Sequence, residues 1–302
     1  MPVRLDKLED LAAQDGPLHL ALGVFDGVHI GHRAVIARAV DAAKADGGRA
    51  FVVTFSPHPI RVIAPGKAPS SLLATLDEKA EVVKGLGVEG ILVIHFDAEF
   101  AKMPAEDFVR KLAAGNVASV SVGEDWRFGS KRLGDVEMLR RMGGELGFRL
   151  NAVSPVMWDG ERISSTRIRQ AIRDGNFDAV EEMLGQPYEI SGTVIEGKKL
   201  GRTIGFPTAN IRPGDQQLPK DGVWGVTVDG DLKGIANLGM RPTVEGTERL
   251  LEVHLFGFSG DLYGKELRIR FGRFIREERK FASVEELKAQ IARDVVAAEA
   301  GG

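Results

Sequence analysis

The sequence predicts two domains of different class: a parallel α/β sheet, followed by a small antiparallel β-barrel that ends in one helix. In the first half, short apolar runs alternate with segments of helical periodicity, which is typical of βαβ units. After Pro187 the pattern changes to short strands separated by turn residues, which favours a barrel. A chain of 302 residues is long enough for both domains.

The first domain is expected to hold a parallel, Rossmann-like sheet. Thr75 and Glu78 form a capping box at the start of one helix, and Gly47-Gly48 ends another. Ligands of such sheets bind beyond the carboxyl ends of the strands. The expected strands are residues 18–25, 49–55, 90–96, 118–122 and 148–153, and the expected helices are 32–46, 76–86, 105–114 and 134–146.

Two further helices, 165–173 and 177–184, close the first domain. Asn176 caps the second of them and Gly185 ends it, so the predicted domains are residues 1–185 and 186–302. In the second domain Asp229-Gly230-Asp231 reads as a hairpin turn, and Ser283 with Glu286 starts a final helix that runs to about Ala300. The expected strands there are 188–196, 223–228, 232–237, 249–258 and 266–271.

Composition excludes several classes of function. The net charge of −3 and the pI of about 6.1 give no global basic footprint for nucleic acid, so local groups must hold any anionic ligand. Without cysteine there are no disulfides and no thiol chemistry, which fits a reducing compartment. The charged N-terminus and the lack of an 18-residue apolar stretch predict no leader and no membrane span, hence a cytoplasmic protein. A homo-oligomer is left open.

The segment 23–32, Gly-Val-Phe-Asp-Gly-Val-His-Ile-Gly-His, is the most specific chemical feature. Its glycines let backbone approach phosphate, and His29 and His32 stand three apart where a helix begins. A helix start with two imidazoles suits a reacting phosphoryl group. The alternative is a structural histidine pair. A zinc site is disfavoured because the spacing is i,i+3 and no third ligand is near. The phosphate interpretation requires rings that face a cleft able to admit ATP.

Three more segments of the first domain carry candidate groups. Ser164, Ser165 and Thr166 at a helix start, followed by Arg167 and Arg169, resemble a phosphate clamp, although an ordinary serine cap is an alternative. The loop 55–59 holds His58 between two prolines. The segment 122–129 mixes Asp125 with aromatic residues, which suits a flat ring, while core packing of Trp126 and Phe128 is a close alternative.

In the second domain the segment 197–210 is glycine-rich, basic, and closes on Thr208-Ala209-Asn210. Backbone N–H groups with lysine and arginine can cradle phosphates, and hydroxyl and amide oxygens suit Mg²⁺. A β-turn loop with solvated lysines is the alternative.

Together these segments resemble the prokaryotic bifunctional riboflavin kinase/FMN adenylyltransferase family, also called FAD synthetase. The four segments of the first domain match its nucleotidyltransferase (adenylyltransferase) module in the same order. Residues 200–202, 205–210, 222–224, 236–243 and 252–255 match its riboflavin kinase module. Trp224, where Tyr is expected, and Met240 depart from the pattern.

The resemblance implies two ATP-dependent steps, riboflavin to FMN and FMN to FAD, with Mg²⁺ as cofactor and only small-molecule partners. It implies that His29 and His32 serve adenylyl transfer, that Glu252 is the base of the kinase, and that Thr208 and Asn210 contact Mg²⁺–ATP. The implied nucleotide-binding residues of the first module are Gly23, Phe25, Asp26, Gly27, His29, His32, His58, Asp125, Arg162, Ser164, Ser165, Thr166 and Arg169. Those of the second module, for ATP or flavin, are Gly201, Arg202, Gly205, Pro207, Thr208, Asn210 and Arg241.

Rival interpretations remain. His29-Ile30-Gly31-His32 is also the signature of class I aminoacyl-tRNA synthetases, but no Lys-Met-Ser-Lys-Ser-type loop is visible. A second rival is a monofunctional enzyme with one decayed module. A third is a flavin-binding regulatory protein without turnover, although a mere binder needs neither Glu252 nor the paired histidines.

Overall fold

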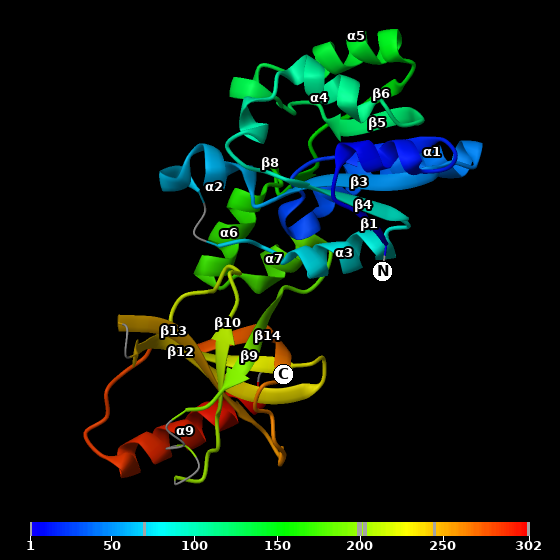
Figure 1. Ribbon diagram of the computed structural model, residues 1–302. Coiled ribbons are helices and arrows are strands. Elements are labelled where there is room, and N and C mark those ends of the chain that lie inside the picture. Colours follow the sequence, from blue (N-terminus) through cyan, green and yellow to red (C-terminus); the bar gives the residue numbers. More distant parts are fainter. Residues whose placement is uncertain (1, 69–70, 198–200, 202–203, 244–245, 301–302) are drawn as a thin grey trace. The chain divides into compact units, whose positions relative to one another are not determined.

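The computed structural model describes residues 2–68, 71–197, 201, 204–243 and 246–300 (Figure 1). By its contacts the chain divides into two compact units, Met1–Ser165 and Thr166–Gly302. Helices α6 (Ser165–Asp174) and α7 (Phe177–Leu184) have the predicted positions, but all except the first residue of α6 falls in the second unit. There Phe177 stacks on Phe271 at 5.8 Å between ring centroids. The sequence-based domain boundary after residue 185 stays a prediction.

The first unit contains the predicted parallel sheet. Its strands lie in the order β1-β4-β3-β2-β5-β6, and every neighbouring pair is parallel. The order reverses beside β2, because β3 lies on one side of it and β5 on the other, and ligands of such sheets bind at the carboxyl ends next to this reversal. The strands are β1 (Val3–Leu5), β2 (Leu18–Leu22), β3 (Arg49–Ser56), β4 (Gly90–His95), β5 (Val117–Gly123) and β6 (Arg149–Val153).

Helices cover both faces of this sheet (Figure 1). Ala21 and Val52 pack in one apolar cluster with residues of α1 (Ile30–Asp46) and α3 (Leu76–Gly85). Leu20 and Phe51, one residue earlier on the same strands, pack with α4 (Ala105–Leu112) and α5 (Val136–Leu146). This alternation follows from the two-residue period of a strand, and burial on both faces explains why the strands are apolar throughout.

Local end signals in the sequence set most helix boundaries correctly. Thr75 and Glu78 form the predicted capping box, Gly47 ends α1 with φ of 72°, and Asn176 caps α7. The sequence missed β1, whose three residues pair with β4, and the two-stranded hairpin of β7 (Met157–Trp158) and β8 (Glu161–Arg162). It also missed the short helices, which are η1 (Leu8–Ala13), η2 (Asp26–Val28), α2 (Pro59–Ile63), η3 (Pro65–Lys67), η4 (Phe100–Lys102) and η5 (Ser130–Arg132).

The second unit contains the predicted closed antiparallel barrel. Its strand order is β10-β13-β12-β11-β14-β9, and β9 pairs with β10 to close it. The predicted turn at Asp229 joins β11 to β12, and Ser283 caps the final helix α9 (Val284–Glu299). The sequence missed β10. The strands are β9 (Glu189–Ile195), β10 (Ala209–Pro213), β11 (Gly222–Val228), β12 (Leu232–Thr243), β13 (Gly246–Leu255) and β14 (Glu266–Arg276).

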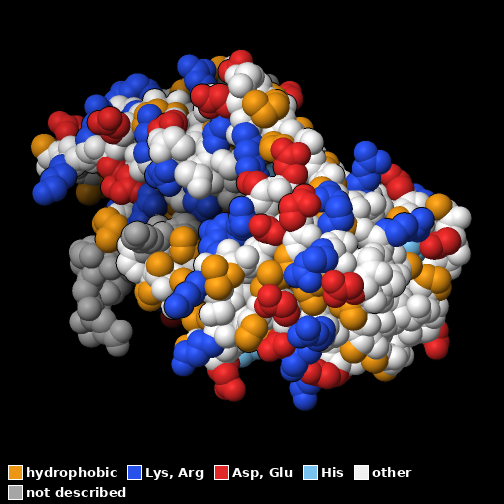
Figure 2. Space-filling view, turned by 90° about the horizontal axis from the view of Figure 1, so that it is seen from above, with side chains coloured by type: hydrophobic (Ala, Val, Ile, Leu, Met, Phe, Trp, Pro, Cys, Tyr) orange, Lys and Arg blue, Asp and Glu red, His pale blue; other side chains and the backbone are white. Residues whose placement is uncertain are grey.

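The surface charge and the character of the helices both bear on function. Figure 2 shows Lys and Arg side chains interspersed with Asp and Glu on the face it displays, so that face carries no field of a single sign. Within the described part of the chain, no helix combines the length and the apolar character needed to cross a bilayer.

Candidate functional site

The turn between β2 and α1 places the histidine motif at the carboxyl end of β2, next to the reversal of strand order. Three residues in it have left-handed backbone, Phe25 with φ of 50°, Gly27 with 79° and Val28 with 43°. For phenylalanine and for a β-branched valine this conformation is strained, and such strain persists only where neighbouring contacts hold it. Gly23 is required for packing, because a Cβ there would lie 2.9 Å from the Phe25 ring.

The two histidines lie against each other at the start of α1. His29 is the N-cap residue, and its Nδ1 accepts a hydrogen bond from the His32 N–H at 3.2 Å. The rings stack with centroids 3.5 Å apart and planes 16° apart. Since Nδ1 of His29 is an acceptor, the neutral ring carries its proton on Nε2, which makes Nε2–H a hydrogen-bond donor.

This pair is more enclosed than the open phosphate cradle expected from the sequence. His29 is 6% exposed, and Nδ1 of the partly exposed His32 is buried without a hydrogen-bond partner among the described residues. Burial, together with the charge of Arg162, lowers the pKa of His29 to about 4, and burial also lowers the pKa of His32 well below its ordinary range. Both rings are therefore neutral at pH 7. One of the helix N–H groups expected to be free for phosphate is used by the His29 cap.

The segment before α6 comes to the same turn. The Ser165 hydroxyl donates to the backbone carbonyl of Asp26 at 3.1 Å. Arg162 is bound through both of its terminal nitrogens to the carboxylate of Asp125, which follows β5. This hydrogen bond from Arg162 holds the pKa of Asp125 below its usual range. The structure thus joins two of the residues implied for nucleotide binding, and Arg162 must leave Asp125 to reach a phosphate.

The remaining predicted residues of this site come from several segments of the chain. His58 follows β3 and caps α2, where its Nδ1 accepts the Ile60 N–H at 3.3 Å. Asp26 is 4% exposed and its carboxylate accepts the Leu73 N–H at 2.9 Å. Ser164 immediately precedes α6, whereas Thr166 and Arg169 belong to the second unit. The expected phosphate contacts of the last two residues stay predictions.

The aromatic residues of segment 122–129 belong to the core. Trp126 stacks on Phe128 at 4.6 Å, and Phe128 also packs on Phe108 at 5.8 Å. The packing alternative is correct for these two side chains, because both join the cluster between the sheet and α4.

The second unit holds a cavity of about 680 Å³. It lies between the outward faces of β10, β12 and β13, the segment after β14, and α9. Several sequence-predicted residues line it, together with apolar side chains at the α9 side. The lining includes Gly201, Thr208, Asn210, Asn237, Arg241, Glu252, Glu278, Phe281, Leu287 and Ile291.

Strand register places the predicted catalytic groups in one row. Glu252 on β13 lies opposite Asn210 on β10 and opposite Asn237 on β12. Residues directly opposite in a sheet project from the same face, so these three side chains point to the cavity together. The next row, which includes Val253 and Trp224, points to the barrel core.

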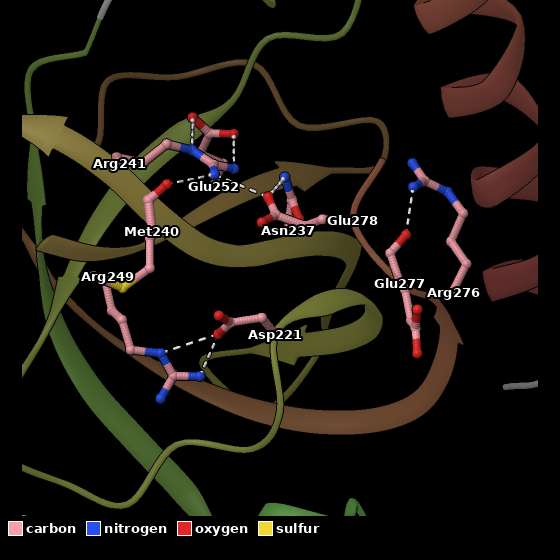
Figure 3. A network of polar contacts seen from close by, with 9 residues as sticks. All are labelled: Asp221, Asn237, Met240, Arg241, Arg249, Glu252, Arg276, Glu277 and Glu278. Carbon is pink, nitrogen blue, oxygen red and sulfur yellow. Dashed lines mark hydrogen bonds and ion pairs between the residues drawn. The ribbon is translucent and has the colours of Figure 1, made fainter. Parts of the chain in front are cut away.

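Arg241 holds the predicted base. Its Nε and Nη2 donate to the two carboxylate oxygens of Glu252 at 3.3 and 3.2 Å, and its Nη1 lies 2.9 Å from Glu278 (Figure 3). Asn237 donates to Glu278 at 2.9 Å. One guanidinium therefore stands between two carboxylates, and Glu252 must weaken its contact with Arg241 before it can accept a proton.

The loop before β10 is shaped by close contacts. Nδ1 of His254 donates to the Pro207 carbonyl at 2.8 Å, which fixes the residue before Thr208. A Cβ on Gly201 would lie 2.3 Å from the Phe206 carbonyl, and Gly205 has φ of 89°. Arg202 lies outside the described residues.

The two departures from the family pattern differ in consequence. Trp224 is fully buried, donates from Nε1 to the Lys220 carbonyl at 3.2 Å, and is not among the residues that line the cavity. Met240 lines the cavity and is 47% exposed, so it remains free to change the pocket.

Sequence reasoning missed Lys79 and Glu278. The helical period of α3 places Lys79 on the apolar face with Leu76 and Val83. A lysine on such a face indicates a buried ammonium that is paired with polar groups. Glu278 follows β14 in a segment without a local motif, so only the tertiary structure could bring it to Arg241.

The described residues contain no cluster of three or more His, Asp or Glu side chains that could hold a metal by themselves. Thr208 and Asn210 offer a hydroxyl and an amide oxygen at the cavity, with the Glu252 carboxylate in the same row as Asn210. These hard oxygen donors fit Mg²⁺, which usually takes few protein ligands and completes its shell with phosphates and water.

Comparison with known proteins gives matches over both units. The FAD synthetase family matches residues 11–167 and the riboflavin kinase family matches residues 184–301. Proteins described as bifunctional riboflavin kinase/FMN adenylyltransferase are 42% identical in Escherichia coli K12, over 95% of this chain and 93% of theirs, and 37% identical in Bacillus subtilis 168, over 91% and 89%.

A solved structure from Streptococcus pneumoniae, described as a macrolide-efflux protein, has a TM-score of 0.87 and 31% identity, and the match covers 99% of this chain and 98% of that one. The description as an efflux protein applies to that protein alone. The two family matches and the two relatives agree on riboflavin kinase and FAD synthetase, or FMN adenylyltransferase.

Proposed function

Because both of its halves match flavin-enzyme families, the chain belongs to the bifunctional riboflavin kinase/FMN adenylyltransferases, and we propose that the two sites described above each carry one of the two reactions. The enzyme forms FMN from riboflavin and ATP, and FAD from FMN and ATP. Membership in this family decides against the aminoacyl-tRNA synthetase alternative. The observation that supports two sites is that each unit brings its own predicted residues together, His29 and His32 in one and Asn210 and Glu252 in the other.

In the kinase unit Glu252 acts as the base. The ribityl hydroxyl of riboflavin attacks the γ-phosphate of ATP, and a positioned carboxylate assists by taking its proton. Glu252 projects into the cavity. As the reaction proceeds, Arg241 can release Glu252 while it keeps its contact with Glu278 or binds phosphate oxygens. Thr208 and Asn210 would hold Mg²⁺, which neutralises charge on the transferred phosphoryl group when bound.

In the adenylyltransferase unit no base is needed. The phosphate of FMN, with a second pKa of about 6, is already mostly a dianion at pH 7 and attacks the α-phosphate of ATP, releasing pyrophosphate. The difficulty is to hold two anions together and to stabilise the charge of the transition state. Nε2–H of His29 donates to the α-phosphate, with His32 stacked behind it. Arg162, released from Asp125, adds positive charge.

The natural setting of both steps is the cytoplasm, because both consume ATP. The substrates are small molecules, so the function requires neither nucleic acid nor a membrane.

Product chromatography tests the assignment of sites. Wild-type enzyme with riboflavin and Mg-ATP should give FMN and FAD. Glu252→Ala should form no FMN from riboflavin and should still form FAD from supplied FMN, while His29→Ala should accumulate FMN with FAD formation reduced about 100-fold. Glu266→Ala, an exposed glutamate on β14, is the matched control and should behave as wild type. Loss of both activities in Glu252→Ala would contradict separate sites, and unchanged FAD output would remove His29 from the chemistry.

A further inference from the structure

Lys79 is a buried lysine that the two reactions described above do not use. It lies in the first turns of α3 and is 7% exposed. Removing an ammonium from water costs several kcal/mol unless the protein supplies partners. The hydrogen-bond partners of this amine therefore indicate the role of Lys79.

The amine is fastened to the turn that precedes the histidines. Nζ of Lys79 donates to the Val24 carbonyl at 2.7 Å and to the Thr54 hydroxyl at 3.3 Å. Thr54 itself donates to the same Val24 carbonyl at 2.9 Å. The carboxylate of Asp26, two residues further on, attracts the ammonium and also accepts the Leu73 N–H. Hence two side chains, those of Lys79 and Thr54, converge on the Val24 carbonyl, and Asp26 of the same turn lies near the ammonium.

That turn is the strained part of the site. Phe25, directly after the carbonyl that Lys79 holds, has φ of 50°, and Val28 has φ of 43°. At the opposite end Nε of Arg33 donates to the Val28 carbonyl at 3.1 Å. Non-glycine residues in this region are strained and need surrounding contacts to persist. Two basic side chains therefore hold the turn, one at each end.

Lys79 also supplies charge where the histidines do not. Both rings are neutral at pH 7, and the charge of Lys79 is among the causes that lower the pKa of His32, after burial and His29. A charge inside a protein is screened less than a charge at the surface. A fixed cation behind the turn would favour the approach of the two anionic substrates.

We propose that Lys79 is a positioning residue for adenylyl transfer: its ammonium clamps the Val24–Val28 turn from inside the unit and provides a buried positive charge behind the α-phosphate site. This inference rests on the proposed role of the turn that carries His29 and His32.

The protonation of Lys79 gives a direct readout. Burial lowers its pKa to about 8, although Asp26 partly opposes this effect. The titratable groups that interact with the amine are Asp26 on the turn and His32 on α1, and the pKa of His32 is lowered well below its ordinary range. Thr54 on β3 is uncharged. The ammonium is therefore present at pH 7 and lost as pH rises above about 8.

The experiment measures FAD formation from FMN and ATP by the full-length enzyme between pH 6 and 10. For wild type, kcat/KM for ATP should fall about tenfold per pH unit above pH 8, because this parameter reports the free enzyme. Lys79→Met should lower kcat/KM about 100-fold at pH 7 and show no such fall. Lys79→Arg should keep more activity than Lys79→Met and lose the fall, because guanidinium stays charged. Lys84→Met, an exposed lysine of the same helix, is the matched control.

Riboflavin phosphorylation by the same preparations should stay unchanged and reports that the barrel unit is folded. A wild-type profile that is flat to pH 10, or Lys79→Met within twofold of wild type, would overturn the proposal, and the wild-type profile decides even if Lys79→Met does not fold. His29→Ala separates the two hypotheses: if that variant keeps full FAD formation, the proposed function of the turn fails, whatever the Lys79 variants show.

Discussion

The charge state of His29 leads to a quantitative prediction about stability. Its ring is buried, and Nδ1 is committed to the His32 N–H. Burial, reinforced by Arg162, lowers its pKa from 6.5 to about 4. The unfolded chain therefore binds a proton at this residue before the folded chain does. Above pH 6.5 the free energy of unfolding is not reduced by this residue. It decreases as pH falls from 6.5 towards 4, and below pH 4 this residue reduces it no further.

The magnitude follows from these two pKa values. At pH 5 the unfolded histidine is almost fully protonated and the folded one is almost neutral, which lowers the free energy of unfolding by about 2 kcal/mol. Near pH 4 and below the loss approaches about 3 kcal/mol. At pH 7 only about one folded molecule in a thousand carries a charged ring. His29 therefore acts as a neutral donor under working conditions.

The comparison variant is His29→Asn, because an asparagine amide oxygen can accept the same N–H as an N-cap while adding no titratable group. Hydrogen exchange of α1 amides at pH 7.5 and pH 5 measures the opening free energy of this unit without assuming one transition for the whole chain. Between the two pH values wild type should lose about 2 kcal/mol more than His29→Asn. The other titrating groups are common to both proteins, and among them the pKa of His32 depends on burial first and on His29 second.

A second readout is the ring itself. Nitrogen NMR of the imidazoles should show His29 as the Nε2–H tautomer with a midpoint near pH 4. An equal pH dependence in wild type and His29→Asn, or a ring that titrates near 6.5, would refute the buried geometry. The assignment of Nε2–H as the phosphate donor would fall with it.

Three further predictions concern the barrel unit. Asp294, 2% exposed on α9, accepts from Nε and Nη2 of Arg276 at 3.0 and 2.8 Å. Asp294→Ala leaves that guanidinium without its carboxylate partner and should lower the free energy of unfolding of this unit by about 3–5 kcal/mol in urea titrations, and an unchanged midpoint would contradict this role. Arg241→Gln leaves the carboxylates of Glu252 and Glu278 facing each other and should slow FMN formation at least about tenfold. Adding Glu278→Gln to this variant should recover part of the rate. Strictly additive effects in the double-mutant cycle would show that the two carboxylates do not share the guanidinium. Asn210→Ala should raise the Mg²⁺ concentration for half-maximal FMN formation about tenfold, and an unchanged value would remove Asn210 from the metal site.

Much of the fold could be predicted because its signals are local. Helix ends are set by residues that act on backbone groups within four residues of themselves, so they can be predicted from the sequence alone. Examples are Gly47, the Thr75–Glu78 pair and Asn176. Elements without such signals were missed. β1 is three residues long and is held by pairing with β4, and β10 lies in a proline-containing motif whose strand character depends on β9 and β13.

The amino-acid sequence by itself determined the two fold classes, the order of the elements, the family, and the identity of the groups suited to phosphate and proton chemistry. Only the tertiary structure decided how those groups are engaged: His29 as a neutral capping ring, Arg162 on Asp125, Glu252 under Arg241, and Lys79 behind the histidine turn. The physical reason is distance along the chain. Lys79 and Val24 are 55 residues apart, and whether a buried charge meets its partner depends on the packing of helices against a sheet, which no local pattern encodes.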